Sequence, residues 1–149
     1  MNARDIMTQE VRTLSPECTI GEAVRQFAQE KIQSFPIIDA NRKLLGTLNL
    51  WKILEHVLPD YLLSGELREV GYAPDLKQIH ERLVAAKHEA VSSLMTVNPP
   101  VVSPDDSVLA CATLIMNTPK TVYLLPVVDT SQHLLGIIAP WDIIKEIAQ

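Results

Sequence analysis

The sequence predicts an α+β fold in which one strand–helix–strand–strand–helix unit occurs twice. Two observations lead to this prediction. Five short blocks recur in the same order in the two halves of the chain. Within each half, the spacing of apolar residues alternates between the period of a strand and the period of a helix. A unit of about 55 residues is marginal as an independent fold, so we expect the two copies to pack together.

The recurring blocks set the limits of the two copies. Met7-Thr8 recurs as Met95-Thr96, and Ser15-Pro16 recurs as Ser103-Pro104, both 88 positions later. Three later blocks recur 90 positions apart, so the second copy has two extra residues, which we place near Asn117–Lys120. The matched blocks are Phe35-Pro36-Ile37-Ile38-Asp39 with Leu125-Pro126-Val127-Val128-Asp129, Leu44-Leu45-Gly46 with Leu134-Leu135-Gly136, and Trp51 with Trp141. Repeat 1 therefore spans residues 4–57 and repeat 2 spans residues 92–147, with a connecting segment at 58–91.

The elements of each repeat follow from local patterns. A capping box formed by Thr19 and Glu22 predicts the start of a helix. A compact β-branched run, a polar turn and a returning apolar run predict a hairpin. In repeat 1 the expected strand, helix, two strands and helix are Val11–Leu14, Ile20–Ala28, Phe35–Ile38, Leu44–Leu48 and Trp51–Val57. Repeat 2 has the same series at Val101–Val102, Val108–Met116, Tyr123–Val128, Leu134–Ile138 and Trp141–Ile147.

The connecting segment is long for a compact domain unless it has structure of its own. Pro74-Asp75 is typical of a helix start, and an apolar stripe follows at Leu76, Ile79, Leu83, Val84 and Ala90. We predict an additional amphipathic helix here, lying on the module or at a subunit contact. We expect Asp60–Ala73 to be the most mobile stretch of the chain.

Composition argues against several classes of protein. The 149 residues are 47% hydrophobic, which is too much for a disordered chain, and the net charge of −5 is not segregated into a basic patch that would bind a nucleic-acid backbone. No apolar stretch approaches the ~20 residues that cross a bilayer, and no signal peptide is apparent. Two cysteines, Cys18 and Cys111, are too few for a disulfide scaffold, so we expect a cytoplasmic protein.

The repeated blocks resemble those of tandem CBS-domain proteins, in the paired arrangement called a Bateman module. The matching motifs are Asp5-Ile6-Met7-Thr8 and Ser93-Leu94-Met95-Thr96, the two Ser-Pro-acidic blocks, and the two Leu-Leu-Gly hairpins. The resemblance covers both repeats and implies two β-α-β-β-α units related by a pseudo-two-fold axis. It also implies a homodimer that forms a disc of four repeats, binds an adenosine-type ligand between the repeats and regulates another protein.

The ligand motif of that family runs Gly-hydrophobic-hydrophobic-Thr/Ser-x-x-Asp. Its hydroxyl and helix-start N–H groups hold phosphate, and its carboxylate accepts hydrogen bonds from the ribose hydroxyls. Repeat 2 keeps the carboxylate as Asp142 but has Ala139, followed by Pro140, in place of the hydroxyl. Repeat 1 has Asn49 at the hydroxyl position and Lys52 in place of the carboxylate. The resemblance therefore favours the repeat-2 cleft.

The same alignment gives the other candidate ligand-binding positions, which precede the first strands or surround the second: Arg4, Ser92, Ser34, Phe35, Pro36, Tyr123, Leu124 and Pro126. Tyr123 is the most suggestive, because a ring beside a cleft can stack on a purine, although a strand tyrosine is more often a core or interface residue. The candidate regulatory ligands are AMP, ADP, ATP, adenosine and S-adenosylmethionine, and no obligatory cofactor is expected.

Two hypotheses remain open. The chain is a ligand sensor, or it is a ligand-free dimerisation scaffold whose clefts have decayed and in which Asp142 only caps its helix. We expect neither an enzyme nor a metal site, since no nucleophile, phosphate-loop or dinucleotide motif occurs and His80 and His88 lie ~12 Å apart along a helix. Trp51 and Trp141 are expected at the junction of the repeats.

Overall fold

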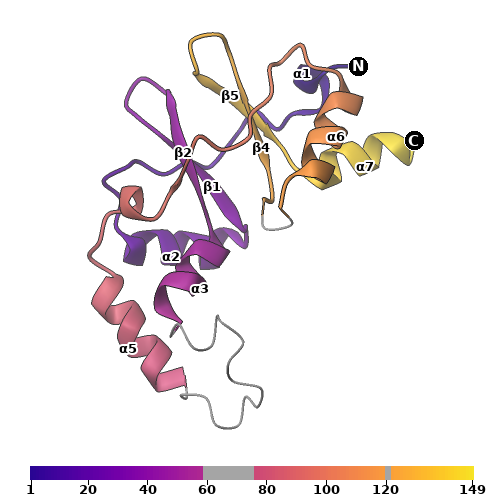
Figure 1. Cartoon of the computed structure of the whole chain (residues 1–149). Coiled ribbons are helices and arrows are strands. Elements are labelled where there is room, and N and C mark those ends of the chain that lie inside the picture. Colours follow the sequence, from indigo (N-terminus) through magenta and orange to yellow (C-terminus); the bar gives the residue numbers. More distant parts are fainter. Residues whose placement is uncertain (59–75, 120–121) are drawn as a thin grey trace.

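Each repeat places a β-hairpin beside a pair of helices (Figure 1). The computed structural model describes residues 1–58, 76–119 and 122–149. In repeat 1 the hairpin and its helices are β1 (Ser34–Ile38), β2 (Leu44–Asn49), α2 (Ile20–Glu30) and α3 (Leu50–Val57). In repeat 2 they are β4 (Leu125–Val128), β5 (Leu134–Ile138), α6 (Val108–Asn117) and α7 (Pro140–Ile147). The predicted α+β fold with two repeats is confirmed.

Local sequence explains where these elements begin. Thr19 Oγ1 accepts a hydrogen bond from the Glu22 N–H, and the Glu22 carboxylate accepts one from the Thr19 N–H, so the capping box starts α2 as predicted. At the hairpin turns, Asp39 and Asp129 each accept two backbone N–H bonds at 2.9 Å through one carboxylate oxygen. The hydrogen bond from the His133 N–H is the largest cause of the lowered pKa of Asp129.

The expected first strand of each repeat is much shorter than predicted. Leu14 forms a single parallel bridge with Ile37, and Val102 forms the equivalent bridge with Val127. Each bridging residue exchanges two backbone hydrogen bonds with the hairpin beside it, at 3.0 and 3.1 Å for Leu14 and 3.0 Å for Val102. In each repeat the chain reaches a proline two residues later, so the pairing does not continue past the bridge.

The two repeats exchange their N-terminal segments. Helix α1 (Ala3–Ile6) precedes repeat 1 in the sequence but packs against α6 and β5 of repeat 2, and Thr8 bridges Ile137. In the same way, the 3₁₀ turn Val91–Ser93 and strand β3 (Thr96–Val97) pack on repeat 1, where β3 pairs with β2. Figure 1 shows both crossings, and each repeat is complete only when it includes a segment of the other.

A glycine permits each exchanged segment to come close. A Cβ at Gly46 would lie 2.5 Å from the Thr96 carbonyl oxygen, and a Cβ at Gly136 would lie 2.7 Å from the Thr8 carbonyl oxygen. Real Cβ atoms do not approach an oxygen so closely. The two Leu-Leu-Gly blocks therefore carry glycine because the neighbouring backbone occupies the space of a side chain.

The exchanged segments contribute to two separate cores. The first core contains Val91 together with residues of repeat 1: Leu14, Cys18, Ile20, Ala23, Phe27, Phe35, Ile37, Leu48 and Ile53. The second contains Ala3 and Ile6 together with residues of repeat 2: Val102, Cys111, Leu125, Val127, Ile138 and Ile143.

The two hairpins also pair with each other near their turns. The Leu44 N–H donates a hydrogen bond to the Gln132 carbonyl, and the Leu134 N–H donates one to the Arg42 carbonyl, both at 2.9 Å.

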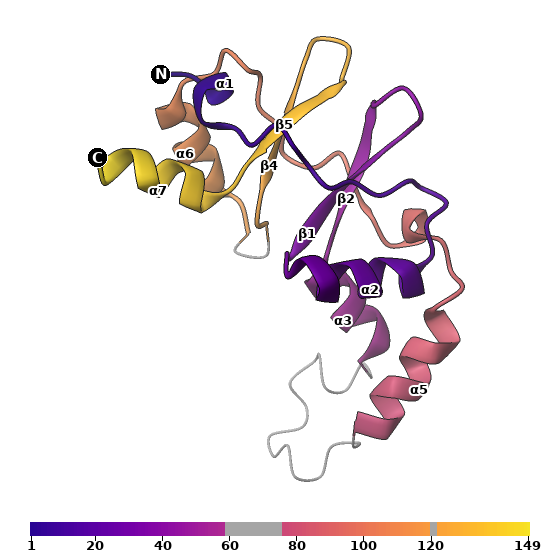
Figure 2. The ribbon, with the colours of Figure 1, turned by 180° about the vertical axis from the view of Figure 1, so that it is seen from behind.

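The connecting segment contains a helix, α5 (Leu76–Ala86), which packs against α2 and α3. Figure 2 shows α5 at the end of the molecule remote from α6 and α7. Of the predicted apolar stripe, Leu83 packs against the first core, whereas Leu76 and Val84 are exposed. That part of the stripe prediction is wrong, because Leu76 lies at the first residue of α5 and Val84 lies one position past the inward-facing Leu83. The predicted start at Pro74-Asp75 and the stretch Asp60–Ala73 lie outside the described residues.

Candidate ligand cleft between the repeats

Asp142 lies in the first turn of α7 and is buried. Its Oδ2 accepts a hydrogen bond of 2.8 Å from the Ala139 N–H, and its Oδ1 lies 3.7 Å from the Lys145 ammonium. Because the residue at position 139 has no hydroxyl and Pro140 has no N–H, the carboxylate supplies the polar character of this helix start. The predicted carboxylate therefore lies at the start of α7, where it caps its own helix.

The start of α3 in repeat 1 has a different chemistry. Asn49 caps this helix by accepting a hydrogen bond of 3.0 Å from the Lys52 N–H. Lys52 lines a polar cavity of about 320 Å³ together with Glu55, His56, Ser93, Leu94 and Met95. Beside that cavity, His56 Nε2 lies 3.2 Å from a carboxylate oxygen of Glu89. An ammonium group thus stands where repeat 2 has a carboxylate.

Tyr123 makes a contact that the sequence analysis missed. The Trp51 Nε1–H donates a hydrogen bond to the Tyr123 hydroxyl, which joins the start of α3 in repeat 1 to the chain just before β4 in repeat 2. Tyr123 is therefore partnered on the repeat-1 side of the junction. Trp141, the counterpart of Trp51, is the more exposed of the two, at 69% against 45%. The matched positions of the two tryptophans were the signal that pointed to this junction.

The candidates around the second strands are largely core residues. Phe35, Pro36 and Pro126 are fully buried, and the Phe35 ring packs edge-on against Phe27 with a centroid separation of 4.7 Å. Ser34 and Leu124, at the starts of the same segments, are also buried. With these side chains inside the core, this part of the predicted site offers a ligand mainly its backbone.

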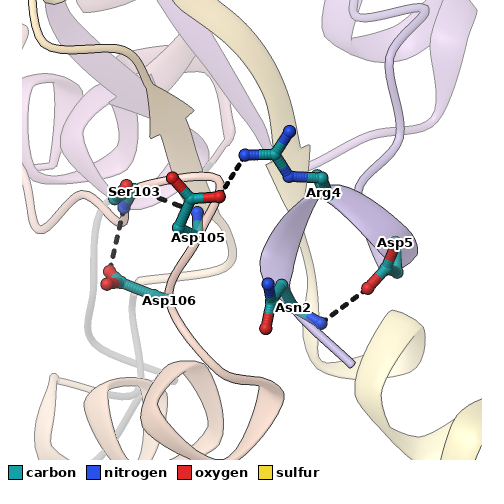
Figure 3. Close-up of polar contacts among 6 residues, drawn as sticks. All are labelled: Asn2, Arg4, Asp5, Ser103, Asp105 and Asp106. Carbon is teal, nitrogen blue, oxygen red and sulfur yellow. Dashed lines mark hydrogen bonds and ion pairs between the residues drawn. The ribbon is translucent and has the colours of Figure 1, made fainter.

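Arg4 and Ser92 occupy equivalent positions in the exchanged segments, and both are exposed. The Arg4 guanidinium forms an ion pair with Asp105, in the turn before α6 (Figure 3). The Ser103 side chain and the Asp106 carboxylate hold that turn through hydrogen bonds of 3.3 and 2.9 Å to backbone N–H groups. The structure therefore holds Arg4 at the turn before α6 and Asp142 at the start of α7.

Neither cysteine has the environment of a reactive thiol. Burial is the main cause that raises the pKa of Cys18 to about 11, with the Glu22 carboxylate adding to it, and burial also raises the pKa of Cys111. Within residues 1–58, 76–119 and 122–149, no group of three His, Cys, Asp or Glu side chains is placed to hold a metal ion.

The duplicated unit, the exchanged segments and the carboxylate at the start of α7 are the features of a tandem CBS pair. The sequence pattern of the CBS domain matches residues 3–59 and again residues 91–149, which together are more than half of the chain. The chain belongs to the CBS-domain family, as the repeated blocks predicted.

Known structures with the same fold include ligand complexes. CBSX2, solved in complex with AMP, is 22% identical, and the alignment covers 99% of this chain and 96% of that one with a TM-score of 0.72. The CBS pair of protein MJ0100, solved with 5-methylthioadenosine and S-adenosyl-L-methionine, is 20% identical with a TM-score of 0.68, and the shares covered are 99% and 96%. At these identities the likeness shows the fold.

Curated relatives are longer than this chain. The chloroplastic CBSX2 of Arabidopsis thaliana is 25% identical over 154 residues, which cover 97% of this chain and 63% of the relative. A homoserine O-acetyltransferase of Methanohalobium evestigatum is 22% identical over 145 residues, and here the chain spans 97% of its own length but only 24% of the enzyme. The chain thus covers less than two thirds of either protein.

No helix in the described part of the chain is both long enough and apolar enough to span a bilayer.

Proposed function

We propose that this CBS pair is a regulatory sensor that binds an adenosine-type ligand on the repeat-2 side of the junction. The observation that supports this proposal most directly is the Asp142 carboxylate at the start of α7. An ionised carboxylate offers about four acceptor positions, and the Ala139 N–H uses one of them. Capacity therefore remains for both hydroxyls of a ribose. The AMP and adenosyl complexes of two proteins with the same fold support this class of ligand.

The helix start favours a ligand that depends little on phosphate. Ala139 has no hydroxyl and Pro140 has no backbone N–H. A motif with Thr or Ser at the first position and a residue other than proline at the second would supply both of these hydrogen-bond donors to a phosphate, and this helix start supplies neither. Adenosine and S-adenosylmethionine lose less than AMP, ADP or ATP. We therefore place the two phosphate-free compounds ahead of the nucleotides.

The repeat-1 side is the weaker candidate. The positive charge of Lys52 is compatible with an anion, but its ammonium group cannot accept hydrogen bonds from the hydroxyls of a ribose. The Tyr123 hydroxyl is also engaged by Trp51, so stacking by its ring on a purine here would compete with that contact. We propose one ligand for each chain.

Isothermal titration calorimetry with adenosine, S-adenosylmethionine, AMP, ADP and ATP tests the proposal. We expect binding of at least one compound, and a loss of affinity of tenfold or more in Asp142→Ala. Asp142→Asn keeps an acceptor for the Ala139 N–H, so it separates loss of the charge from loss of the helix cap. Lys52→Ala is the matched control at the equivalent position and should leave the affinity unchanged. No heat and no melting shift with any compound would overturn the proposal.

The second candidate function is a ligand-free scaffold for protein interaction. The Asp142 carboxylate is already used as a helix cap, and neither repeat has the hydroxyl of the family motif. This candidate predicts that Asp142→Ala changes stability alone, while deletion of α5 changes assembly or partner capture.

We further propose that the chain regulates another protein as a homodimer and does not catalyse a reaction, bind nucleic acid or need an obligatory cofactor. A reducing, cytoplasmic location is supported by the two buried free thiols, Cys18 and Cys111. We also propose that residues 4–57 and 92–147, with the segment 58–91 between them, form one folding unit. The exchange of N-terminal segments supports this, because neither half has a complete core without the other.

A further inference from the structure

A small basic cavity lies where the connecting segment meets the start of α2, beside the end of α5 (Figure 2). It has a volume of about 220 Å³, and its lining residues are Thr19, Gly21, Glu22, Arg25, Lys87 and His88. Three of these side chains are basic, although the whole chain has a net charge of −5. None of the lining residues belongs to repeat 2, so the cavity is separate from the junction of the repeats.

The backbone holds the basic side chains around this cavity. Helix α5 ends at Ala86, and the chain turns at Lys87 and His88. The Gly21 N–H donates a hydrogen bond of 3.0 Å to the Lys87 carbonyl, which fixes this turn against the start of α2. Arg25 lies one turn further along α2, on the same face as Gly21. Two segments that are bonded to each other therefore present all three basic groups to one space.

These three basic side chains have no acidic partner. Among the residues that the structure describes, no carboxylate lies within ion-pair distance of Arg25, Lys87 or His88. Glu22 lines the same cavity, but its carboxylate accepts a hydrogen bond from the Thr19 N–H in the capping box. All three basic residues are exposed and accessible to a ligand. Positive charges that converge without a partner repel one another, and an anion between them would replace that repulsion with attraction.

Repeat 2 shows that the fold does not need this basic cluster. Helix α6 begins with the same kind of cap, in which Ser107 accepts a hydrogen bond of 3.0 Å from the Ala110 N–H. At the position of Arg25 it has Thr113, and no Lys, Arg or His occurs between Ser107 and Asn117. The equivalent helix thus forms without basic residues, so those beside α2 are not explained by folding alone.

We infer that the basic cavity binds a phosphate group, at a site separate from the cleft beside Asp142. Arg25 can donate two parallel hydrogen bonds to phosphate oxygens, and Lys87 adds a compact positive charge. His88 adds a donor and carries a charge when protonated. The volume of about 220 Å³ is below the usual range for a pocket that encloses a whole drug-sized ligand. The site therefore suits inorganic phosphate or the phosphate end of a larger compound.

A bound phosphate would connect α2 to the connecting segment. The first four N–H groups of α2 are already bonded, to the carbonyls of Glu89 and Lys87 and to Thr19, so side chains alone hold the anion. Arg25 belongs to α2, whereas Lys87 and His88 follow α5. An anion between them fastens α5 to repeat 1, and phosphate should therefore stabilise the folded chain by mass action.

Isothermal titration calorimetry of the full chain with inorganic phosphate, at an ionic strength kept constant with potassium chloride, tests this inference. We expect a dissociation constant below about 1 mM, and at least a tenfold loss of affinity in Arg25→Gln and in Lys87→Gln. Lys31→Gln removes one exposed positive charge from the other end of α2 and should leave the affinity within about twofold. Phosphate should also raise the melting temperature of the wild-type chain, but not that of the variant with both Arg25→Gln and Lys87→Gln.

Three results would overturn the inference. The first is no binding of phosphate by the wild-type chain up to about 10 mM. The second is a loss in Lys31→Gln as large as in Arg25→Gln, since the attraction would then come from general charge. The third is a loss in Lys52→Ala alone, which would place the phosphate in the repeat-1 cleft. Circular dichroism checks that the variants fold. Calorimetry of Arg25→Gln with S-adenosylmethionine reports on the Asp142 cleft, so the phosphate site and the proposed function can fail independently.

Discussion

Val57 and Ile147 occupy the same place at the ends of α3 and α7, yet Val57 is 3% exposed and Ile147 is 74% exposed. The core residues one turn earlier, Ile53 and Ile143, are equally buried in both repeats. The duplication has therefore preserved the inner faces of the helices, while the outer faces have diverged with their neighbours. Helix α5 is such a neighbour in repeat 1, where it packs against α2 and α3.

The helix starts beside the junction have diverged in the same way. Repeat 1 caps α3 with a side-chain amide and has an ammonium group three residues later, whereas repeat 2 has a methyl group and a carboxylate at those positions. Trp51 donates a hydrogen bond to Tyr123 across the junction and is 45% exposed, whereas Trp141 is 69% exposed. The two helix starts thus share one backbone geometry but have opposite polar character, and this difference is the reason for expecting a single ligand per chain.

The close approach at the two hairpin glycines should be the most sensitive feature that the repeats share. Gly46→Ala and Gly136→Ala each force a Cβ against a backbone carbonyl of an exchanged segment. We expect each to lower the free energy of unfolding by about 2–3 kcal/mol, since neither carbonyl can move without breaking its pairing. Urea unfolding followed by circular dichroism measures both values.

Gly21→Ala is the control for those two variants. Its Cβ would lie 3.1 Å from the Lys87 Cβ and 3.2 Å from the Lys87 carbonyl oxygen, which is a milder approach than at either hairpin glycine, and alanine favours the helix by about 0.5–1 kcal/mol. The loss at Gly21 should therefore be smaller than at Gly46 or Gly136. A large loss at Gly46 with none at Gly136 would show that the exchange holds repeat 1 but not repeat 2.

The ends of α3 and α7 should respond differently to truncation. Val57→Ala removes buried methyl groups and should cost about 2 kcal/mol, whereas Ile147→Ala removes exposed groups and should change the free energy of unfolding of the monomer by less than about 0.5 kcal/mol. Chemical denaturation at protein concentrations below the dimer dissociation constant measures both. Equal costs at the two positions would mean that Ile147 is covered within its own chain.

The sequence predicted the hairpins and most helices within one or two residues, because turn residues, capping boxes and apolar periods act locally. The sequence did not reveal that α1 packs on repeat 2 and β3 packs on repeat 1. The constant spacing between matching blocks shows which positions of the two repeats are equivalent, but it does not show which repeat an N-terminal segment packs against. The apolar stripe of α5 was wrong at Leu76 for a related reason, because periodicity does not show how far a helix stays in contact. For the site, residue identities placed Asp142 at a helix start, whereas the Trp51–Tyr123 contact depends on how the two repeats are arranged.

The smallest effect concerns the caps of α3 and α7. The backbone at Asn49 (φ −117°, ψ 165°) and at Ala139 (φ −105°, ψ 162°) is nearly the same, so an asparagine at position 139 can adopt the capping geometry of its counterpart. Asn49→Ala should therefore cost about 1 kcal/mol, and Ala139→Asn should gain up to about 1 kcal/mol, in thermal unfolding followed by circular dichroism. Because the Asp142 carboxylate bonds the backbone N–H of residue 139, that bond survives the substitution, and the gain reports only the added cap. A loss of stability in Ala139→Asn would show that the start of α7 lacks room for a side-chain amide, and hence that it differs from α3 in shape as well as in charge.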